Sequence, residues 1–226
     1  MHYPNTQTGF FLSRPNRFVA LVDLNGETVV CHVKNTGRCK ELLIPGAKVV
    51  IQPSQSKGRK TPFTLLAVYK GDRLVNIDSQ IPNHVFAKWV SLGNLFPSHA
   101  VVRPEWRHGD SRFDFLVTWD DKKALVEVKG VTLEEEGVAL FPDAPTERGV
   151  RHLTGLAAAV ADGFDAYAVF IIQMKGVQYF APNEKMHPAF ANALKDAQNK
   201  GVTVLALDCD VTEDSITARS FVPVCL

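Results

Sequence analysis

The stretch from Ser111 to Gly130, SRFDFLVTWDDKKALVEVKG, constrains the fold and the chemistry of this chain more than any other. Two runs of strand-forming residues flank Asp120-Asp121-Lys122, a polar turn of hairpin length. Side chains alternate between the two faces of a strand, so Glu127 and Lys129 are expected to point the same way. The hairpin should then bring Asp114 within reach of both.

These three side chains suit a metal-assisted reaction. Two carboxylates that converge on one face make a hard-oxygen site of the kind that Mg²⁺ accepts, and a neighbouring lysine can orient water or stabilise charge on a phosphate. The pattern therefore indicates hydrolysis of a phosphodiester. Strands that end in E-x-K are also common on solvated faces, where the pair is a weak surface ion pair, and the spacing alone leaves both interpretations open.

The positive charge of the chain is concentrated in its first part. Residues 1–80 contain 11 of the 25 Lys and Arg but only 5 of the 24 Asp and Glu, which leaves 14 against 19 for the remainder. A basic half indicates a polyanionic partner, and an acidic half with carboxylates to spare suits cation binding. The expected partner is nucleic acid, contacted through its phosphates, although a solubilising basic surface has the same composition.

The first part of the chain has the pattern of a small β-domain over residues 1–80. Strands are expected over 17–24, 27–34, 47–52, 62–70 and 73–78. Asn25-Gly26 is a strong hairpin signal, and a short helical turn is predicted over 38–43. The strand count favours a Greek-key barrel of the oligonucleotide-binding (OB) type, with an open sheet or another small barrel as alternatives.

Several residues of this part are candidates for contact with nucleic acid. The basic ones near the predicted strands and in the polar loop after residue 52 are Arg14, Arg17, Arg38, Lys57, Arg59 and Lys60, with Lys40 beside them. Phe10 or Phe11 is a candidate platform for base stacking, although most aromatic residues of a small barrel belong to its core.

Residues 81–226 alternate between helical and strand patterns, which predicts an α/β domain. Asn83 is the expected N-cap of a first helix, and Thr146 the expected N-cap of a helix over 147–161. The start of this second helix carries Arg148 and Arg151, which suit a phosphate, or else pair with nearby acids. His152 is interpreted as a packing or hydrogen-bonding residue rather than a general base.

Three strands and one helix are expected after this second helix. The apolar run over 165–176 predicts a central strand that is covered on both faces. A helix is expected over 188–199 and a buried strand over 202–207. Pro223 restricts the last run, over 216–224, to the edge of the sheet.

Composition excludes several classes of protein. Of the 226 residues, 46% are hydrophobic and 22% are charged, which is typical of a globular chain. No apolar run approaches the roughly 20 residues needed to span a bilayer, and the first residues lack the pattern of a secretory signal. The four cysteines contain no C-x-x-C pair and no set of zinc ligands, so a reduced, cytoplasmic protein is expected.

Longer strings carry a family resemblance. The order of an acid and then E-x-K on strands, followed by a helix and a strand, resembles the restriction-endonuclease-like PD-(D/E)XK core. HVKNTGRCKELLIPG, SRFDF, VEVKGVTL and FPDAPTERGVRHL are similar to the sugar fermentation stimulation protein A family of bacteria and archaea. The similarity covers nearly the whole chain and implies an OB-type barrel joined to a nuclease-like α/β domain with a mixed central sheet.

The resemblance also implies a set of roles. Asp114 and Glu127 match the metal-binding acids, the carbonyl of Val128 a further ligand, and Lys129 the lysine of the core. An acid on the first helix is missing, and Glu105 is the candidate substitute. The resemblance implies DNA binding without sequence specificity. With these residues we expect Mg²⁺ or Mn²⁺ as the cofactor, and the hypothesis is a DNA endonuclease or phosphodiesterase.

Three arginines are expected to hold neighbouring phosphates, namely Arg112, Arg148 and Arg151.

A second hypothesis for the function competes with the nuclease. The resemblance implies a regulatory role in maltose metabolism, so the competing hypothesis is a catalytically inactive DNA-binding regulator that retains the nuclease fold. The sequence does not decide whether the chain is a monomer or a homodimer.

Overall fold

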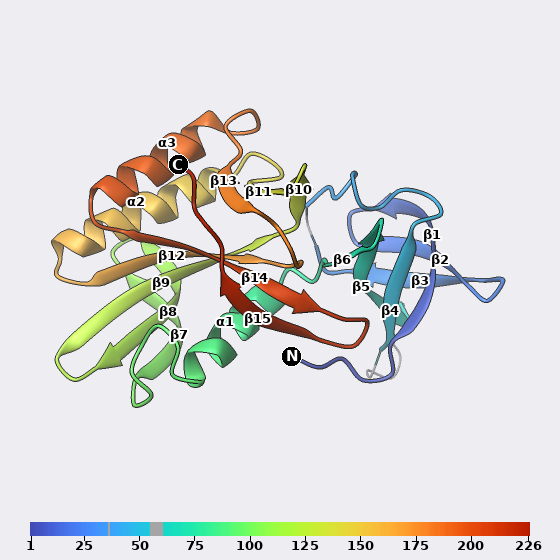
Figure 1. Ribbon diagram of the computed structural model, residues 1–226, viewed down its shortest axis with the longest axis horizontal. Helices are drawn as coiled ribbons and strands as arrows, with labels where there is room; N and C mark the ends of the chain where they lie inside the picture. The colour runs from blue at the N-terminus through green and yellow to red at the C-terminus, as the bar shows by residue number, and fades with distance from the viewer. Residues whose placement is uncertain (36, 55–60) are drawn as a thin grey trace.

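The computed structural model of this protein describes residues 1–35, 37–54 and 61–226 and has two parts (Figure 1). The N-terminal strands, drawn in blue, form a barrel on one side, and a larger part made of strands and helices lies beside it. This is the expected class, a small β-barrel followed by an α/β part with a mixed sheet. Among the described residues, no helix is long and apolar enough to cross a membrane.

The barrel is built from antiparallel neighbours closed by one parallel pairing. Its strands are β1 (Gln7–Asn16), β2 (Val19–Leu24), β3 (Glu27–Val33), β4 (Lys48–Pro53), β5 (Phe63–Lys70) and β6 (Arg73–Asn76). Their order is β3-β2-β1-β4-β5-β6, and β3 also pairs in parallel with β5, which closes β1 to β5 into a barrel. The turn between β2 and β3 has positive φ at Asn25 and Gly26, as a tight hairpin requires. The predicted OB-type barrel is confirmed.

The barrel differs from the sequence prediction in two places. The sequence pattern does not predict β1, because Pro15 and polar neighbours interrupt it, whereas the folded strand accommodates them at register shifts. The helical turn predicted over 38–43 is present but begins one residue later. The amides of Leu42 and Leu43 donate to the carbonyl of Cys39, three and four residues earlier, which makes a single helical turn. Cys39 precedes this turn with a left-handed φ of 45°.

The larger part alternates strands and helices. Its elements are α1 (Ile81–Ser91), β7 (Val101–His108), β8 (Ser111–Trp119), β9 (Lys122–Val131), β10 (Leu133–Glu135), β11 (Val138–Phe141), α2 (Glu147–Ala161), β12 (Asp165–Ile172), β13 (Tyr179–Pro182), α3 (Pro188–Asn199), β14 (Thr203–Val211) and β15 (Ile216–Phe221). The main sheet has the order β15-β14-β12-β9-β8-β7, and a smaller sheet has the order β10-β11-β13.

Helices cover both faces of the main sheet, which makes it the middle of three layers (Figure 1). On one face Phe86 of α1 contacts Phe115 of β8, with ring centroids 5.4 Å apart. On the other face, Leu156 of α2 and Leu194 of α3 belong to the same buried core as β12. β12 pairs in parallel with β9 and β14, so the predicted central strand is confirmed, as is the edge position of β15.

Buried polar contacts fix the barrel against the larger part. The Lys34 Nζ lies 2.8 Å from Oδ2 of Asp78, whose side chain is buried. The Nε2 of Gln173, just after β12, donates to the carbonyls of Asn76 and Asp78, each at 3.0 Å. The bonds from Gln173 join the end of the barrel to the centre of the main sheet, and the Lys34–Asp78 pair joins the barrel to the segment that leads into α1.

The predicted capping of α2 is confirmed. The helix begins after Thr146, whose Oγ1 accepts a hydrogen bond of 3.1 Å from the amide of Gly149. This bond satisfies one of the amide groups that the first turn of a helix leaves free.

Replacing Thr146 with alanine should lower the free energy of unfolding by about 1 kcal/mol, because the N-cap bond is lost. Urea unfolding of both proteins measures the difference. Thr146→Ser, which keeps the hydroxyl, should remain close to the wild type. Equal loss in the serine and alanine variants would show that the cap does not stabilise α2.

Candidate active site

Asp114 lies where the regular alternation of β8 is broken. Phe113 points towards α2 and Phe115 towards α1, although they are two residues apart. The pairing of β8 with β9 starts only at Phe115. In place of a ladder bond, the amide of Val128 donates to Oδ2 of Asp114 at 2.7 Å. Glu105, on the neighbouring strand, has a left-handed φ of 59° at the same level. The break turns the Asp114 carboxylate towards β9.

β9 supplies the other two side chains. Val128 packs in the core on the α1 side, whereas Glu127 faces α2 and is only 3% exposed. Its Oε1 accepts hydrogen bonds from the ammonium of Lys129 and from Nδ1 of His152. Glu127 and Lys129 therefore lie on the same face of the strand.

The pKa values of the two acids, Asp114 and Glu127, shift in opposite directions. Burial raises the pKa of Asp114, and the nearby charge of Glu127 raises it further, while the amide of Val128 acts in the opposite direction. Burial also raises the pKa of Glu127, but the hydrogen bond from His152 and the charge of Lys129 outweigh it and leave this pKa lowered. Glu127 is thus an ionised carboxylate at neutral pH.

All three side chains line one cleft of about 870 Å³. Its walls come from β7, from β8 and β9, and from the segments that begin α1 and α2. They include Ser79, Gln80, Asn83, His84, Val102, Pro104, Glu105, Phe141, Thr146, Arg148 and Gly149. Two helix N-termini thus meet at the cleft, and helix N-termini favour anions such as phosphate.

Asn83 does not cap α1. The helix begins at Ile81, and Gln80 occupies the cap position without a side-chain bond. Asn83 lies in the first turn instead, where its Nδ2 donates to Oδ1 of Asp114 at 2.8 Å. The N-cap prediction is therefore wrong because Pro82 starts the helix earlier, and Asn83 becomes part of the site.

The residues present fit a divalent cation. Oε2 of Glu127 is buried and has no hydrogen-bond partner among the described residues, which is costly for a carboxylate oxygen unless something else satisfies it. Asp114 and the carbonyl of Val128 add further hard oxygens, the ligands that Mg²⁺ prefers. Within the described ranges no three His, Cys, Asp or Glu residues form a metal-binding group, so backbone and water oxygens would complete the coordination.

The cleft contains only some of the predicted phosphate-binding arginines. Arg148 lines it, whereas Arg112 and Arg151 do not. Arg112 pairs with Glu105 at 2.8 Å, and both are exposed. Arg151 lies on the exposed side of α2. Glu105 lines the cleft, as expected of a substitute for the missing acid on the first helix. Its carboxylate, however, pairs with Arg112.

A second concave surface lies on the barrel, with a volume of about 530 Å³. Its charged lining residues are Arg14, Arg17, Arg38 and Lys40, and it also includes Ala144, two residues before the N-cap of α2. We call it the basic pocket. Because Ala144 lies in the short segment between Phe141 and Thr146, which line the cleft, the pocket adjoins the cleft across that segment.

Arg14 holds the backbone around the basic pocket in place through hydrogen bonds. Its terminal nitrogens donate to four carbonyls, those of Arg17 (2.7 Å), Asn35 (2.8 Å), Gly37 (2.9 Å) and Arg38 (2.8 Å). These bonds use all four terminal N–H groups, so Arg14 has none left for the phosphate contact that the sequence suggests. Arg17, Arg38 and Lys40 are exposed.

The two candidate residues for base stacking, Phe10 and Phe11, differ in exposure. Phe11 is 2% exposed and belongs to the barrel core, whereas Phe10 is 55% exposed on the outer face. Phe18 is also exposed, and the guanidinium of Arg17 lies 5.9 Å from its ring centroid. Lys57, Arg59 and Lys60 lie outside the described residues.

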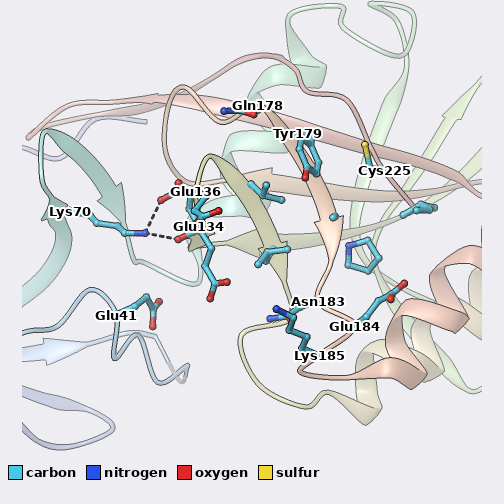
Figure 2. Close-up of a pocket in the computed structure, with 16 residues that line it drawn as sticks. Glu41, Lys70, Glu134, Glu136, Gln178, Tyr179, Asn183, Glu184, Lys185 and Cys225 are labelled. Carbon is cyan, nitrogen blue, oxygen red and sulfur yellow. Dashed lines mark hydrogen bonds and ion pairs between the residues drawn. The ribbon is translucent and has the colours of Figure 1, made fainter.

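A third cavity, of about 930 Å³, lies between the barrel and the small sheet (Figure 2). Figure 2 shows Lys70 reaching across to Glu134, with Glu41 facing the same space. Lys70 and Arg73 both pair with the Glu134 carboxylate, at 2.7 and 2.9 Å. This ion cluster is thus a contact between the two parts of the chain. Oε1 of Glu41 is also buried without a hydrogen-bond partner among the described residues. The cleft is the better candidate for chemistry because its free carboxylate oxygen lies with Asp114 and Lys129 between two helix N-termini.

The structure adds two residues to the site that the sequence does not assign to it. His152 forms a hydrogen bond, as predicted, but its partner is Glu127. Asn83 contacts Asp114. The sequence contains one weak signal that could have assigned His152 to the site. It lies four residues after Arg148, which places both side chains on the same side of α2.

An OB-type barrel followed by a mixed sheet with an acid and E-x-K in one cleft defines a protein of the restriction-endonuclease-like class. The chain belongs to the sugar fermentation stimulation protein family. Residues 80–215 match the Sugar fermentation stimulation protein RE domain, and residues 12–77 match the SfsA N-terminal OB domain.

Relatives match along nearly their whole length. The Sugar fermentation stimulation protein homolog of Desulfitobacterium hafniense (strain Y51) is 57% identical over 224 residues, covering 99% of this chain and 98% of that protein. The homolog of Clostridium beijerinckii is 52% identical over 226 residues, covering 100% of both. The solved structure of Pyrococcus furiosus SfsA in complex with Ca²⁺ is similar with a TM-score of 0.90 and 32% identity, covering 100% of this chain and 98% of that one.

Proposed function

We propose that this protein binds DNA without sequence specificity and hydrolyses its phosphodiester bonds with a divalent cation, Mg²⁺ or Mn²⁺. The observation that carries the proposal is the free, buried Oε2 of Glu127 beside Asp114 and Lys129 in a cleft between two helix N-termini. The Ca²⁺ in the Pyrococcus furiosus relative supports a divalent cation at some site of this chain.

Asp114, Glu127 and the carbonyl of Val128 would hold the cation. When bound, a divalent cation lowers the pKa of a coordinated water and offsets negative charge on a phosphate. Glu127 is buried and Asp114 is half-buried, and the lower local dielectric strengthens each of these interactions.

The other residues bind and orient. The ammonium of Lys129, beside the Glu127 carboxylate, orients the attacking water and stabilises charge on the phosphate. Arg148 and the free amide groups at the start of α2 hold a phosphate in the cleft. Arg112 and Arg151 remain candidates for phosphates farther along the strand.

Incubation of the purified protein with single-stranded, duplex and branched DNA tests the proposal. Cleavage should occur with Mg²⁺ or Mn²⁺ and stop with chelator, and the sizes of the products identify the preferred substrate. Absence of cleavage on every substrate with either ion would overturn the enzymatic part of the proposal.

Arg17→Ala and Lys40→Ala should each weaken DNA binding and reduce the slope of log affinity against log salt by about 1, because each removes one phosphate contact. Fluorescence anisotropy over a series of salt concentrations measures the slope. Lys200→Ala is a suitable control, because this exposed lysine pairs with Asp196 on α3. Slopes equal to that of the control would exclude the basic pocket as a DNA site.

The alternative is a DNA-binding regulator of maltose metabolism that retains the nuclease fold without an efficient reaction. The specific observation in its favour is that Lys129 and both acids already have protein partners. This alternative predicts the same salt dependence but no cleavage, so the incubation experiment separates the two.

A further inference from the structure

His152 is the buried neighbour of the proposed metal ligand. Its side chain is almost enclosed, with a residue exposure of 7%, and its ring lies edge-on to Phe113 at 6.0 Å between centroids. Nδ1 contacts Oε1 of Glu127, and Nε2 lies 3.3 Å from Nε of Arg148. His152 is not among the residues that line the cleft, whereas Arg148 and Glu127 are.

These contacts determine the tautomer of the ring. The Nε of an arginine side chain is always a donor, so Nε2 of His152 accepts its hydrogen. A neutral imidazole that accepts at Nε2 carries its proton on Nδ1, which then donates to Glu127. Arg148 thus assigns the direction of the bond that His152 makes with the carboxylate.

The bond also determines which oxygen of Glu127 remains available. Oε1 receives donors from both Lys129 and His152, whereas Oε2 is buried without a partner among the described residues. A carboxylate held by a single flexible lysine could rotate and exchange its oxygens. A second donor on a ring that packs against Phe113 prevents that exchange.

We infer that His152 is a positioning residue, held by Arg148, that fixes the Glu127 carboxylate so that Oε2 is presented to the cation. The inference rests on the proposed function, because it requires that Glu127 bind a divalent ion. It assigns no chemistry to His152 itself, because the ring is buried and both of its nitrogens are engaged. Ligand-orienting partners of this kind typically change metal affinity about 10- to 100-fold when they are removed.

Titration with Mn²⁺ in the absence of DNA, followed by calorimetry or by the electron paramagnetic resonance signal of free Mn²⁺, tests the inference without using activity. His152→Leu, which removes the donor, should weaken binding about 10- to 100-fold. His152→Asn, whose Nδ2 occupies nearly the same place as Nδ1, should restore most of the affinity. Rescue by asparagine separates orientation of the carboxylate from simple loss of packing.

Thr154→Ala is the matched control, because this threonine lies on the same helix, is exposed and does not line the cleft. It should bind Mn²⁺ as the wild type does. If His152→Leu fails to fold, Arg148→Lys, which keeps the positive charge of this exposed residue but removes the Nε donor, decides the question in the same titration and should also weaken binding. Unchanged affinity in the folded variants would overturn the inference alone, whereas no Mn²⁺ binding by the wild type would overturn it together with the proposed metal site.

Discussion

Replacing Asp114 with asparagine, or Glu127 with glutamine, is expected to lower metal-dependent cleavage of DNA about a thousandfold. A bound metal ion contributes several kcal/mol of transition-state stabilisation, and each 1.4 kcal/mol or so corresponds to a factor of ten in rate. Both changes keep the size of the side chain but remove the negative charge that would hold the cation. DNA binding should persist, because the basic pocket is unchanged.

Initial rates of cleavage, measured with saturating DNA and a fixed concentration of Mn²⁺, quantify this effect. Asp121→Asn is the control, since Asp121 lies in the exposed turn of the same hairpin and does not line the cleft. It should retain most of the activity. A comparable rate in all three variants would show that cleavage does not depend on Asp114 and Glu127.

The largest expected effect on stability comes from Glu134. Burial raises the pKa of this residue, but hydrogen bonds from Lys70, from the amide of Gly137 and from Arg73 outweigh it and bring the pKa from 4.5 to about 2. Glu134→Gln removes the charge that both cations contact. The free energy of unfolding at pH 7 should fall by about 1–2 kcal/mol, because the charged form is stabilised in the folded state only and water screens the partly exposed cations.

The sign of the shift sets the pH dependence. A folded-state pKa below the unfolded value means that the contribution is fully present above about pH 4.5 and is lost as the pH falls towards 2. Urea unfolding at a series of pH values should show the wild type and Glu134→Gln converging over this window. Glu184→Gln, which affects an exposed pair with Lys195, should differ little from the wild type at every pH. A constant gap for Glu134→Gln would exclude the ionised cluster as its cause.

Local patterns were sufficient to predict the hairpin that carries the site. The alternation in β8 and β9 and the polar turn between them are properties of neighbouring residues, and they place Glu127 and Lys129 together. The cap of α2 is local in the same sense, because Thr146 and the amide it accepts from are three residues apart. The strands β10 and β13, with 3 and 4 residues, are too short to show a period.

Contacts between distant segments could not be predicted in this way. Arg14 appears as one more basic residue, yet carbonyls up to 24 residues away hold its terminal nitrogens. The bond from Asn83 to Asp114 spans 31 residues, and the one from His152 to Glu127 spans 25. The bonds of Asn83 and His152 depend on how a helix docks on the sheet, and that is decided by packing of the core rather than by the pattern within either segment.

The most direct test of the central claim is a crystal structure of this protein grown with Mn²⁺, with anomalous difference density used to locate the ion. The account predicts a peak within coordination distance of Oε2 of Glu127, the Asp114 carboxylate and the carbonyl of Val128. A well-ordered cleft without a peak, or a peak confined to the cavity beside Glu41 and Glu134, would contradict it.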